Sequence, residues 1–277
     1  MIIGHARILS DFRKLAQTNR LSHGYIFFGP SMVGKRTVAL GLASYLETGN
    51  LESRGILQDC LTIEPDADGK IGIDSIRPIK GFLWQRPIIS SRRTLVLDRA
   101  ELLTAEAQNA LLKITEEPPS STLFILVTND LESLNPTILS RLYHVFLPAL
   151  SVAEVKKWLV EALKIKTAEA ERIASESLGK PGLAAAIIGD KKFNYYIAAA
   201  EKLLKVAPAG RREFIKKLMD KEDFNFPVLL DAVILRRVLL RSSGKSVIPG
   251  WHELLDLRRK AAYFNLNPRL QIEGLLS

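Results

Sequence analysis

The feature that most limits how this chain can fold is an apolar segment that runs into a glycine-rich loop and then a helical pattern. Residues 25–28 are apolar or aromatic, and residues 29–37 read Gly-Pro-Ser-Met-Val-Gly-Lys-Arg-Thr. A strand, a tight glycine loop and a helix N-terminus in this order are typical of a phosphate-binding loop, because backbone N–H groups and the helix dipole face one anion. The candidate nucleotide-binding residues here are Gly29, Gly34 and Lys35.

Short apolar runs and helical patterns alternate over the first 150 residues. Strands are predicted at 25–28, 94–97, 123–128 and 143–147, and helices at 35–46, 74–85 and 104–116. Near-continuous apolar strands indicate a sheet covered on both faces, which predicts an α/β fold with a parallel sheet and flanking helices. The third helix has Thr104 as a candidate N-cap.

After residue 150 only helical patterns follow, at 151–163, 167–178, 181–188 and over much of 191–277. The first of them opens with Ser151 and has Glu154 three residues later, which predicts a capping box. We therefore expect three domains: an α/β nucleotide-binding-like domain at 1–149, a small helical lid domain at 150–189, and an all-α C-terminal domain at 190–277.

Charge is uneven along the chain, which has a net charge of +9. Residues 1–150 carry 16 basic and 15 acidic side chains, and residues 151–277 carry 23 and 15. A basic half can attract nucleic acid or an acidic partner, and it can equally consist of solvated helix faces rich in lysine. The sequence leaves both interpretations open.

Composition excludes several classes of protein. Cys60 is the only cysteine, so the chain can form neither an internal disulfide nor a zinc site with two or more cysteine ligands. No apolar run approaches the roughly 18 residues of a membrane span. The first residues lack the layout of a signal peptide, so we expect a cytoplasmic protein with no membrane partner.

The phosphate loop departs from its usual pattern after the lysine. Arg36 stands where a hydroxyl would bind Mg²⁺, and Thr37 follows one residue late, which turns it about 100° around a helix. Met32 also replaces a residue that is often small. Both weak or absent nucleotide binding and competent binding of ATP or ADP remain open.

A second motif, the apolar run 94–97 followed by Asp98, departs in a similar way. In nucleotide hydrolases such an aspartate holds Mg²⁺, and the next residue is commonly a glutamate that orients the attacking water. Here the next residue is Arg99, whose guanidinium cannot act as a base, and Glu101 lies two residues further on. Hydrolysis by this chain is therefore not expected.

The order of the remaining motifs is more specific than any one of them. Ser-His-Gly-Tyr-Ile-Phe at 22–27 precedes the loop, Ile-Asp-Ser-Ile-Arg lies at 73–77, Asn-Ala-Leu-Leu-Lys at 109–113, and Glu-Glu-Pro-Pro at 116–119. Phe-Ile-Leu-Val-Thr-Asn at 124–129 and Pro-Thr-Ile-Leu-Ser-Arg at 136–141 follow. Together they resemble the clamp-loader branch of the AAA+ family, as found in bacterial DNA polymerase III. The resemblance covers residues 2–188 and extends more weakly to 265–270 and 273–276.

The resemblance implies one member of a five-subunit assembly that opens a ring-shaped sliding clamp and places it on primed DNA. Its partners would be sister subunits of the gamma/tau and delta types. In this family an arginine in a Ser-Arg-Cys motif reaches the nucleotide of a neighbouring subunit. Here Ser140 and Arg141 keep that motif and Leu142 replaces the cysteine. The resemblance thus implies that Arg141 is an arginine finger acting in trans; a structural salt bridge is the alternative.

Further positions show which parts of the family pattern are kept. Asn129 matches the first sensor of the nucleotide, whereas Leu183 lies at or near the place of the second sensor arginine. The segment 47–60 has a single cysteine where related motor subunits carry a four-cysteine zinc module, so we expect no zinc and no other bound metal. The residues that serve the chain's own nucleotide are altered, while the residue that serves a neighbour is retained.

Three functions compete on this sequence. The first is a non-hydrolysing clamp-loader subunit, or stator, whose C-terminal helices form a collar with sister subunits. The second is an active AAA+ motor ATPase that uses Lys35, Thr37 and Asp98. The third is a DNA-binding module that relies on the basic C-terminal half. The altered motor residues favour the first.

Overall fold

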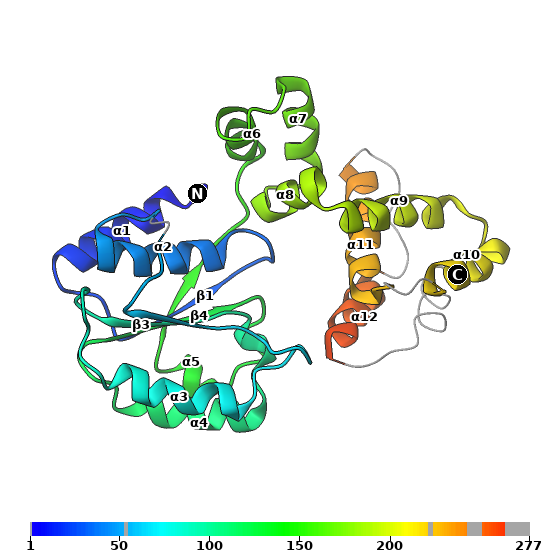
Figure 1. The fold of residues 1–277 in the computed structure, drawn as a ribbon. Coiled ribbons are helices and arrows are strands. Elements are labelled where there is room, and N and C mark those ends of the chain that lie inside the picture. Colours follow the sequence, from blue (N-terminus) through cyan, green and yellow to red (C-terminus); the bar gives the residue numbers. More distant parts are fainter. Residues whose placement is uncertain (1, 53–54, 221–223, 243–250, 264–277) are drawn as a thin grey trace. The chain divides into compact units, whose positions relative to one another are not determined.

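The computed structural model describes residues 2–52, 55–220, 224–242 and 251–263. The chain divides into two compact units, Met1–Ala184 and Ala185–Ser277, which are considered separately here (Figure 1). The predicted closing motifs at 265–270 and 273–276 lie outside the described residues. The first unit contains the whole α/β region together with the first helices after it.

The centre of the first unit is a five-stranded sheet in the order β2-β3-β4-β1-β5. Its strands are β1 (Gly24–Phe28), β2 (Cys60–Ile63), β3 (Arg93–Leu97), β4 (Thr122–Thr128) and β5 (Tyr143–Phe146). Every neighbouring pair is parallel. All residues of β3 and β4 are buried, as expected of strands covered on both faces. The predicted parallel α/β fold is confirmed, and β2 is an additional edge strand that the sequence did not reveal.

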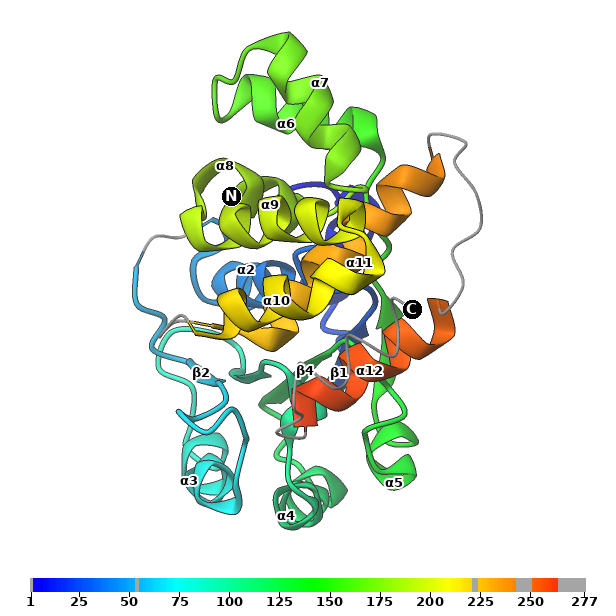
Figure 2. The same ribbon diagram turned by 90° about the vertical axis from the view of Figure 1, so that its right-hand side faces the viewer.

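Helices cover both faces of this sheet (Figures 1 and 2). On one face lie α1 (Ala6–Gln17) and α2 (Lys35–Thr48), and on the other lie α3 (Ile73–Leu83), α4 (Ala105–Glu116) and the short α5 (Pro136–Leu139). Each layer has its own apolar core, because alternate strand residues point to opposite faces. Phe27 packs on the α1/α2 side, and Phe124 on the α3/α4 side.

Both predicted helix starts are confirmed. The Thr104 side chain accepts a hydrogen bond from the N–H of Ala107 at the start of α4. Ser151 and Glu154 form a capping box at the start of α6 (Val152–Glu161). The chain continues with α7 (Thr167–Glu176) and α8 (Pro181–Gly189). These caps supply partners for N–H groups that a helix start otherwise leaves unpaired.

A buried ion pair fixes the amino ends of the strands next to β2. Asp59, immediately before β2, accepts hydrogen bonds from the backbone N–H groups of Ile88, Ile89 and Ser90 and pairs with Arg93 at 3.1 Å. Burial alone would raise the pKa of Asp59, but these three N–H donors and the Arg93 charge together lower it. This carboxylate therefore joins β2, β3 and the segment before β3.

The second unit is entirely helical where it is described. It contains α9 (Lys191–Lys205), α10 (Pro208–Met219), α11 (Phe226–Ser242) and α12 (Trp251–Tyr263). Tyr196 and Leu203 of α9 pack with Leu229 and Val233 of α11 in a buried apolar cluster, and Leu254 of α12 joins them. The absence of strands in the described part of this unit agrees with the helical patterns of the sequence.

Candidate nucleotide loop and trans-acting arginine

The phosphate loop, residues 29–35, connects the carboxyl end of β1 with the start of α2, as its sequence predicted. Gly29 has φ 141° and Gly34 has φ 98°, both in the region that favours glycine. A Cβ atom at Gly29 would lie 2.2 Å from the carbonyl oxygen of Leu147, so a side chain there would collide with backbone. The loop keeps its shape, with Met32 also at positive φ (64°) and its side chain exposed.

Lys35 is turned inward and has its ammonium group fully engaged. Nζ donates to the carbonyl oxygens of Gly29 (2.8 Å) and Pro30 (2.6 Å) and to Oδ1 of Asn129 (2.8 Å). An ammonium group has three donors, so all of them are taken by the chain itself. Burial lowers the pKa of Lys35 to about 8, although Glu101 and Asp98 act in the opposite direction. A phosphate could bind Lys35 only by breaking one of these hydrogen bonds.

Arg36 occupies the surroundings of Asp98. Its Nε lies 3.6 Å from Oδ2 of Asp98, and its NH2 pairs with Glu64, the residue after β2. Burial raises the pKa of Asp98, while the Arg36 charge and the N–H of Arg99 oppose the rise. A fixed cation therefore stands beside the carboxylate that would hold a metal. Because of this cation, the residues around Asp98 do not fit Mg²⁺. The ion pair between Arg36 and Glu64 could not be predicted from the sequence motifs.

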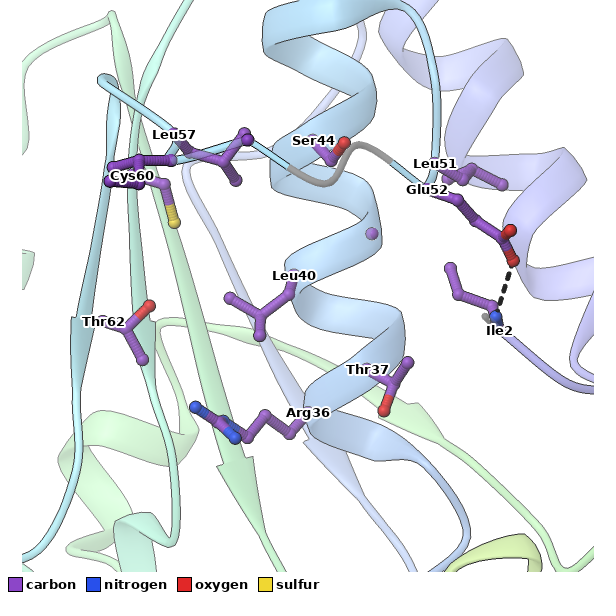
Figure 3. A pocket seen from close by; sticks show the side chains of 13 residues that line it. Ile2, Arg36, Thr37, Leu40, Ser44, Leu51, Glu52, Leu57, Cys60 and Thr62 are labelled. Atoms are coloured by element: carbon purple, nitrogen blue, oxygen red, sulfur yellow. Dashed lines mark hydrogen bonds between the residues drawn. The ribbon is translucent and has the colours of Figure 1, made fainter.

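Thr37 lies apart from the other candidate residues. It is exposed and lines a cavity of about 640 Å³ between α2, β2 and the N-terminal segment. Figure 3 shows Arg36 and Thr37 leaving α2 in different directions, with Leu40, Cys60 and Thr62 around the same cavity. The Thr37 hydroxyl therefore does not replace the missing metal ligand in the loop.

The first-sensor position is part of the same network as Lys35. Asn129, directly after β4, donates from its Nδ2 to Oε1 of Glu101 at 2.5 Å while its Oδ1 accepts from Lys35. Glu101 also accepts from the backbone N–H of Asn129. Glu101 is thus held by the sensor residue, and Arg99 has a left-handed backbone (φ 52°) beside it. Neither side chain occupies the role of the glutamate that orients water in a hydrolase.

The second-sensor position lies on the first turns of α8. Leu183 is buried, and the neighbouring Gly182 donates its N–H to the carbonyl oxygen of Met32 at 2.9 Å. The helix α8 thereby contacts the phosphate loop through a backbone hydrogen bond. It carries no arginine at the second-sensor position. A Cβ atom at Gly182 would lie 3.1 Å from Met32, so this approach is close.

Cysteine chemistry adds no metal site in the described residues. Burial raises the pKa of the Cys60 thiol to about 11, with a partly opposing hydrogen bond to Thr62. Among the residues that the structure describes, no three His, Cys, Asp or Glu side chains gather as metal ligands would. In the same part of the chain, no helix has the length and apolar character needed to cross a bilayer.

Arg141 lies at the other edge of the sheet. It follows α5 and stands two residues before β5, so it is near the amino ends of the strands, whereas the phosphate loop is at their carboxyl ends. Its NH1 donates to the Thr137 carbonyl oxygen and its NH2 to Oε1 of Glu116, both at 3.1 Å. The neighbouring Ser140 hydroxyl donates to Thr137 and contacts no other candidate residue through a described hydrogen bond.

The length of the strands separates Arg141, near their amino ends, from the phosphate loop at their carboxyl ends. Tyr25 pairs with Tyr143 near the amino ends of the strands, and Gly29, directly after β1, lies four residues beyond Tyr25. At about 3.3 Å per residue, the two edges are roughly 13 Å apart before the loop itself is counted. The buried sheet lies between them. Arg141 therefore faces away from the phosphate loop of its own chain.

Several basic side chains in the described part of the second unit pair with acidic residues along helix surfaces. Lys205 pairs with Glu201 and Lys217 with Glu213, each four residues apart, and Arg258 forms two hydrogen bonds to Asp231. Such i,i+4 pairs are typical of solvated helix faces. In the described part of this unit, the arrangement favours solvated helices over a continuous basic groove.

Comparison with known proteins identifies the family. The sequence model of the family described as "DNA polymerase III, delta subunit" matches residues 4–151, which is more than half of the chain. The chain belongs to this family of clamp-loader subunits. The matched region contains the phosphate loop, Asp98, Asn129 and Arg141, so the family assignment rests on the same region as the motifs in the sequence.

Two curated relatives extend this result. The chain is 32% identical over 176 residues to the DNA polymerase III subunit delta' of Pseudomonas aeruginosa, covering 58% of this chain and 54% of that protein. It is 31% identical over 157 residues to the DNA polymerase III subunit gamma/tau of Mycobacterium tuberculosis, covering 52% of this chain and 27% of that protein. The matches therefore span about half of the delta' relative and about a quarter of the gamma/tau relative.

Solved structures show the same fold. A DNA polymerase III gamma subunit-related protein from Thermotoga maritima has a TM-score of 0.55 and 24% identity, over 96% of this chain and 97% of that one. The RuvB Holliday junction branch migration motor of the same organism has a TM-score of 0.51 and 16% identity, over 88% and 83%. These likenesses show that the parallel α/β fold followed by helices, which the sequence predicts, occurs in these proteins as well.

Proposed function

We propose that this chain is a non-hydrolysing, stator-type subunit of the replicative clamp loader, which donates Arg141 to the nucleotide of a neighbouring motor subunit. The observation that carries the proposal is the position of Arg141 at the sheet edge opposite the phosphate loop. A guanidinium is a permanent planar cation and can stabilise charge on a transferring phosphoryl group. From this edge it can serve a nucleotide only on another chain.

The phosphate loop of this chain also supports the proposal, because its two cations are engaged by residues of the same chain. Lys35 donates its three hydrogen bonds to Gly29, Pro30 and Asn129. Arg36 lies beside Asp98, the carboxylate that would hold a metal. Hydrolysis needs both a free cation on the phosphates and a metal that bridges them. We therefore expect no ATPase activity from the isolated chain.

The proposed partners follow from the family. They are motor subunits of the gamma/tau type, a delta-type sister subunit, the sliding clamp, and primed DNA reached through the assembly. In this proposal residues 1–149 form the AAA+ domain, 150–189 the lid, and 190–277 the collar that joins sister subunits. Assembly with replication proteins also makes a cytoplasmic location part of the proposal.

The test compares Arg141→Ala with Lys35→Ala in a reconstituted loader. Arginine fingers contribute about 10³–10⁵ to phosphoryl transfer, so Arg141→Ala should silence one motor site and lower primed-DNA-stimulated hydrolysis by that site's share. Lys35→Ala, which removes a cation from the other edge, should leave the rate unchanged. Hydrolysis that is unaffected by Arg141→Ala would refute the finger. Turnover by the isolated chain that Lys35→Ala abolishes would instead establish a motor ATPase.

A DNA-binding module is the remaining alternative, and the pairing of charge in the second unit argues against it. Filter binding or fluorescence anisotropy of the full chain with single-stranded and duplex DNA over a range of salt concentrations tests it directly. Tight binding with a steep dependence on salt would support phosphate contacts. We expect only weak binding from the chain outside its assembly.

A further inference from the structure

The partner of Arg141 in the uncomplexed chain is an acidic residue that the sequence motifs do not assign to any role. Glu116 is the last residue of α4, and its Oε1 accepts a hydrogen bond from NH2 of Arg141 at 3.1 Å. The Thr137 carbonyl oxygen accepts from NH1 at the same distance. Two of the five N–H donors of the guanidinium are thus used within the described part of the chain, and they fix its direction.

The position of Glu116 in its helix is electrostatically unfavourable by itself. The carboxyl end of a helix carries partial negative charge, and α4 is 12 residues long. A carboxylate on its last residue is therefore repelled by the helix end, and the exposed Glu117 follows directly. Arg141 supplies the positive charge that offsets this repulsion. Arg141 in turn gains a carboxylate partner that holds its guanidinium beside the end of α4.

The exposure of the pair makes it exchangeable. The side chain of Arg141 is 29% exposed and that of Glu116 is 55% exposed. Solvent screens such surface pairs, so each is weak and can be replaced by a stronger anion. The terminal phosphate of a nucleoside triphosphate carries more charge and more acceptor oxygens than one carboxylate, and it suits the guanidinium geometry.

We infer that Glu116 is the resting counter-ion of Arg141, which Arg141 exchanges for the terminal phosphate of a nucleoside triphosphate on the neighbouring subunit. This inference rests on the proposed trans-acting role of Arg141 and adds a positioning residue to it. Glu116 keeps the guanidinium oriented beside α4 in the unassembled subunit. Glu116 also competes with the phosphate for Arg141. Arg141 therefore contacts the neighbour's nucleotide only when assembly or DNA binding brings the phosphate close enough to displace Glu116.

The experiment measures ATP hydrolysis of the reconstituted loader, with and without primed DNA, for Glu116→Gln and for Glu117→Gln as its matched control. Glutamine keeps the size and an acceptor oxygen but removes the competing charge. Glu116→Gln should raise the DNA-free rate at the affected site roughly two- to five-fold, the range expected for a surface ion pair, and leave the stimulated rate nearly unchanged. Glu117→Gln removes an equal charge one residue away and should leave both rates unchanged.

Two further measurements isolate the contact. In an Arg141→Ala background Glu116→Gln should have no effect, because the two changes act through one pair. In binding assays with a non-hydrolysable ATP analogue, Glu116→Gln should tighten the nucleotide-dependent association with motor subunits by a similar factor. Thermal unfolding of each variant confirms that the chain remains folded.

The outcomes distinguish the counter-ion role of Glu116 from the proposed trans-acting role of Arg141. If Arg141→Ala leaves hydrolysis unchanged, the finger itself is refuted. If Arg141→Ala lowers hydrolysis but Glu116→Gln behaves like Glu117→Gln, only the exchange of counter-ions is refuted. A loss of activity in Glu116→Gln that matches Arg141→Ala would also overturn it, because the charge would then be required rather than competing.

Discussion

The two cationic sites at opposite edges of the sheet hold their charges in different ways. At the carboxyl edge, Lys35 is 5% exposed and has its three donors taken by oxygens of its own chain. At the amino edge, Arg141 is 29% exposed and keeps one carboxylate and one carbonyl as partners. The first is a structural cross-link between the loop and β4. The second is a side chain that can change partner at little cost.

This difference shows that the phosphate loop keeps its backbone shape while its charged side chains are engaged by other residues of the same chain. Gly29 and Gly34 still supply the positive φ values that the loop requires. The functional change lies in side chains: Arg36 accompanies Asp98, and Asn129 joins Lys35 to Glu101. The Arg36 guanidinium places a tethered positive charge beside the Asp98 carboxylate, and a guanidinium has no open coordination positions for phosphate, unlike a metal ion.

The largest expected effect is on folding stability and contrasts the two cations directly. Lys35→Met leaves the carbonyl oxygens of Gly29 and Pro30 and the Asn129 side chain without their donor, which should cost about 1–3 kcal/mol in the free energy of unfolding. Arg141→Met removes an exposed pair and should cost less than about 1 kcal/mol. Urea unfolding of both variants measures the difference. Equal costs would contradict the contrast between a cross-link and an exchangeable pair.

The pH dependence of stability tests whether Lys35 is buried as a charged group. Its pKa is about 8 in the folded chain and 10.5 is the usual value, so between these pH values the unfolded chain binds more protons than the folded chain. The free energy of unfolding should therefore rise with pH across this window, by about 1–2 kcal/mol from pH 7.5 to 9.5 through this group. The rise should disappear from Lys35→Met and persist in Lys70→Met, a substitution at an exposed lysine.

A smaller effect is expected when the tethered cation is removed from the metal position. Arg36→Thr frees Asp98 from its counter-ion and places a hydroxyl at the position that the loop pattern calls for. Binding of Mn²⁺ at ten times its dissociation constant would add about 1.4 kcal/mol to stability, which thermal unfolding detects as a shift in Tm. The unsubstituted chain should show no such shift. A shift of the same size in both chains would show that Arg36 does not exclude a metal.

The smallest effect is predicted for Thr37, the hydroxyl that a sequence pattern would select as a metal ligand. Because Thr37 is exposed and lines the outer cavity of Figure 3, Thr37→Ala should change the free energy of unfolding by less than about 0.5 kcal/mol. Loader hydrolysis should also be unchanged. A loss of activity would mean that the assembled subunit uses this hydroxyl after all.

Elements with strong local signals were predictable. Of the four predicted strands, β1, β3 and β4 are apolar and almost entirely buried, whereas β5 is mostly exposed. The helices of the sheet layers α2, α3 and α4 follow periodic patterns. The capping box at Ser151 and Glu154 depends on residues three apart, so it can be read without tertiary structure. The shift of the Thr37 hydroxyl by one residue from the position that the loop pattern requires was likewise a local consequence of helix geometry.

Elements that depend on distant parts of the chain were missed. The strand β2 is only partly buried at the sheet edge, so it lacks a continuous apolar run. The helix α1 buries Leu9 and Phe12, and its Ile8 and Leu15 pack against the same core, while polar residues alternate with them along the chain. The helix α5 is four residues long. Packing against the sheet, rather than local preference, stabilises each of them.

The sequence by itself determined the parallel fold, the altered metal position and the survival of Arg141, because each depends on residue types within a few positions of one another. Only the tertiary structure decided which side chain each cation contacts. Lys35 finds Asn129, Arg36 finds Glu64, and Arg141 finds Glu116, partners that lie 94, 28 and 25 residues away in the chain. Such pairs form because the fold brings the ends of distant strands and helices together. A local pattern of residues therefore cannot predict them.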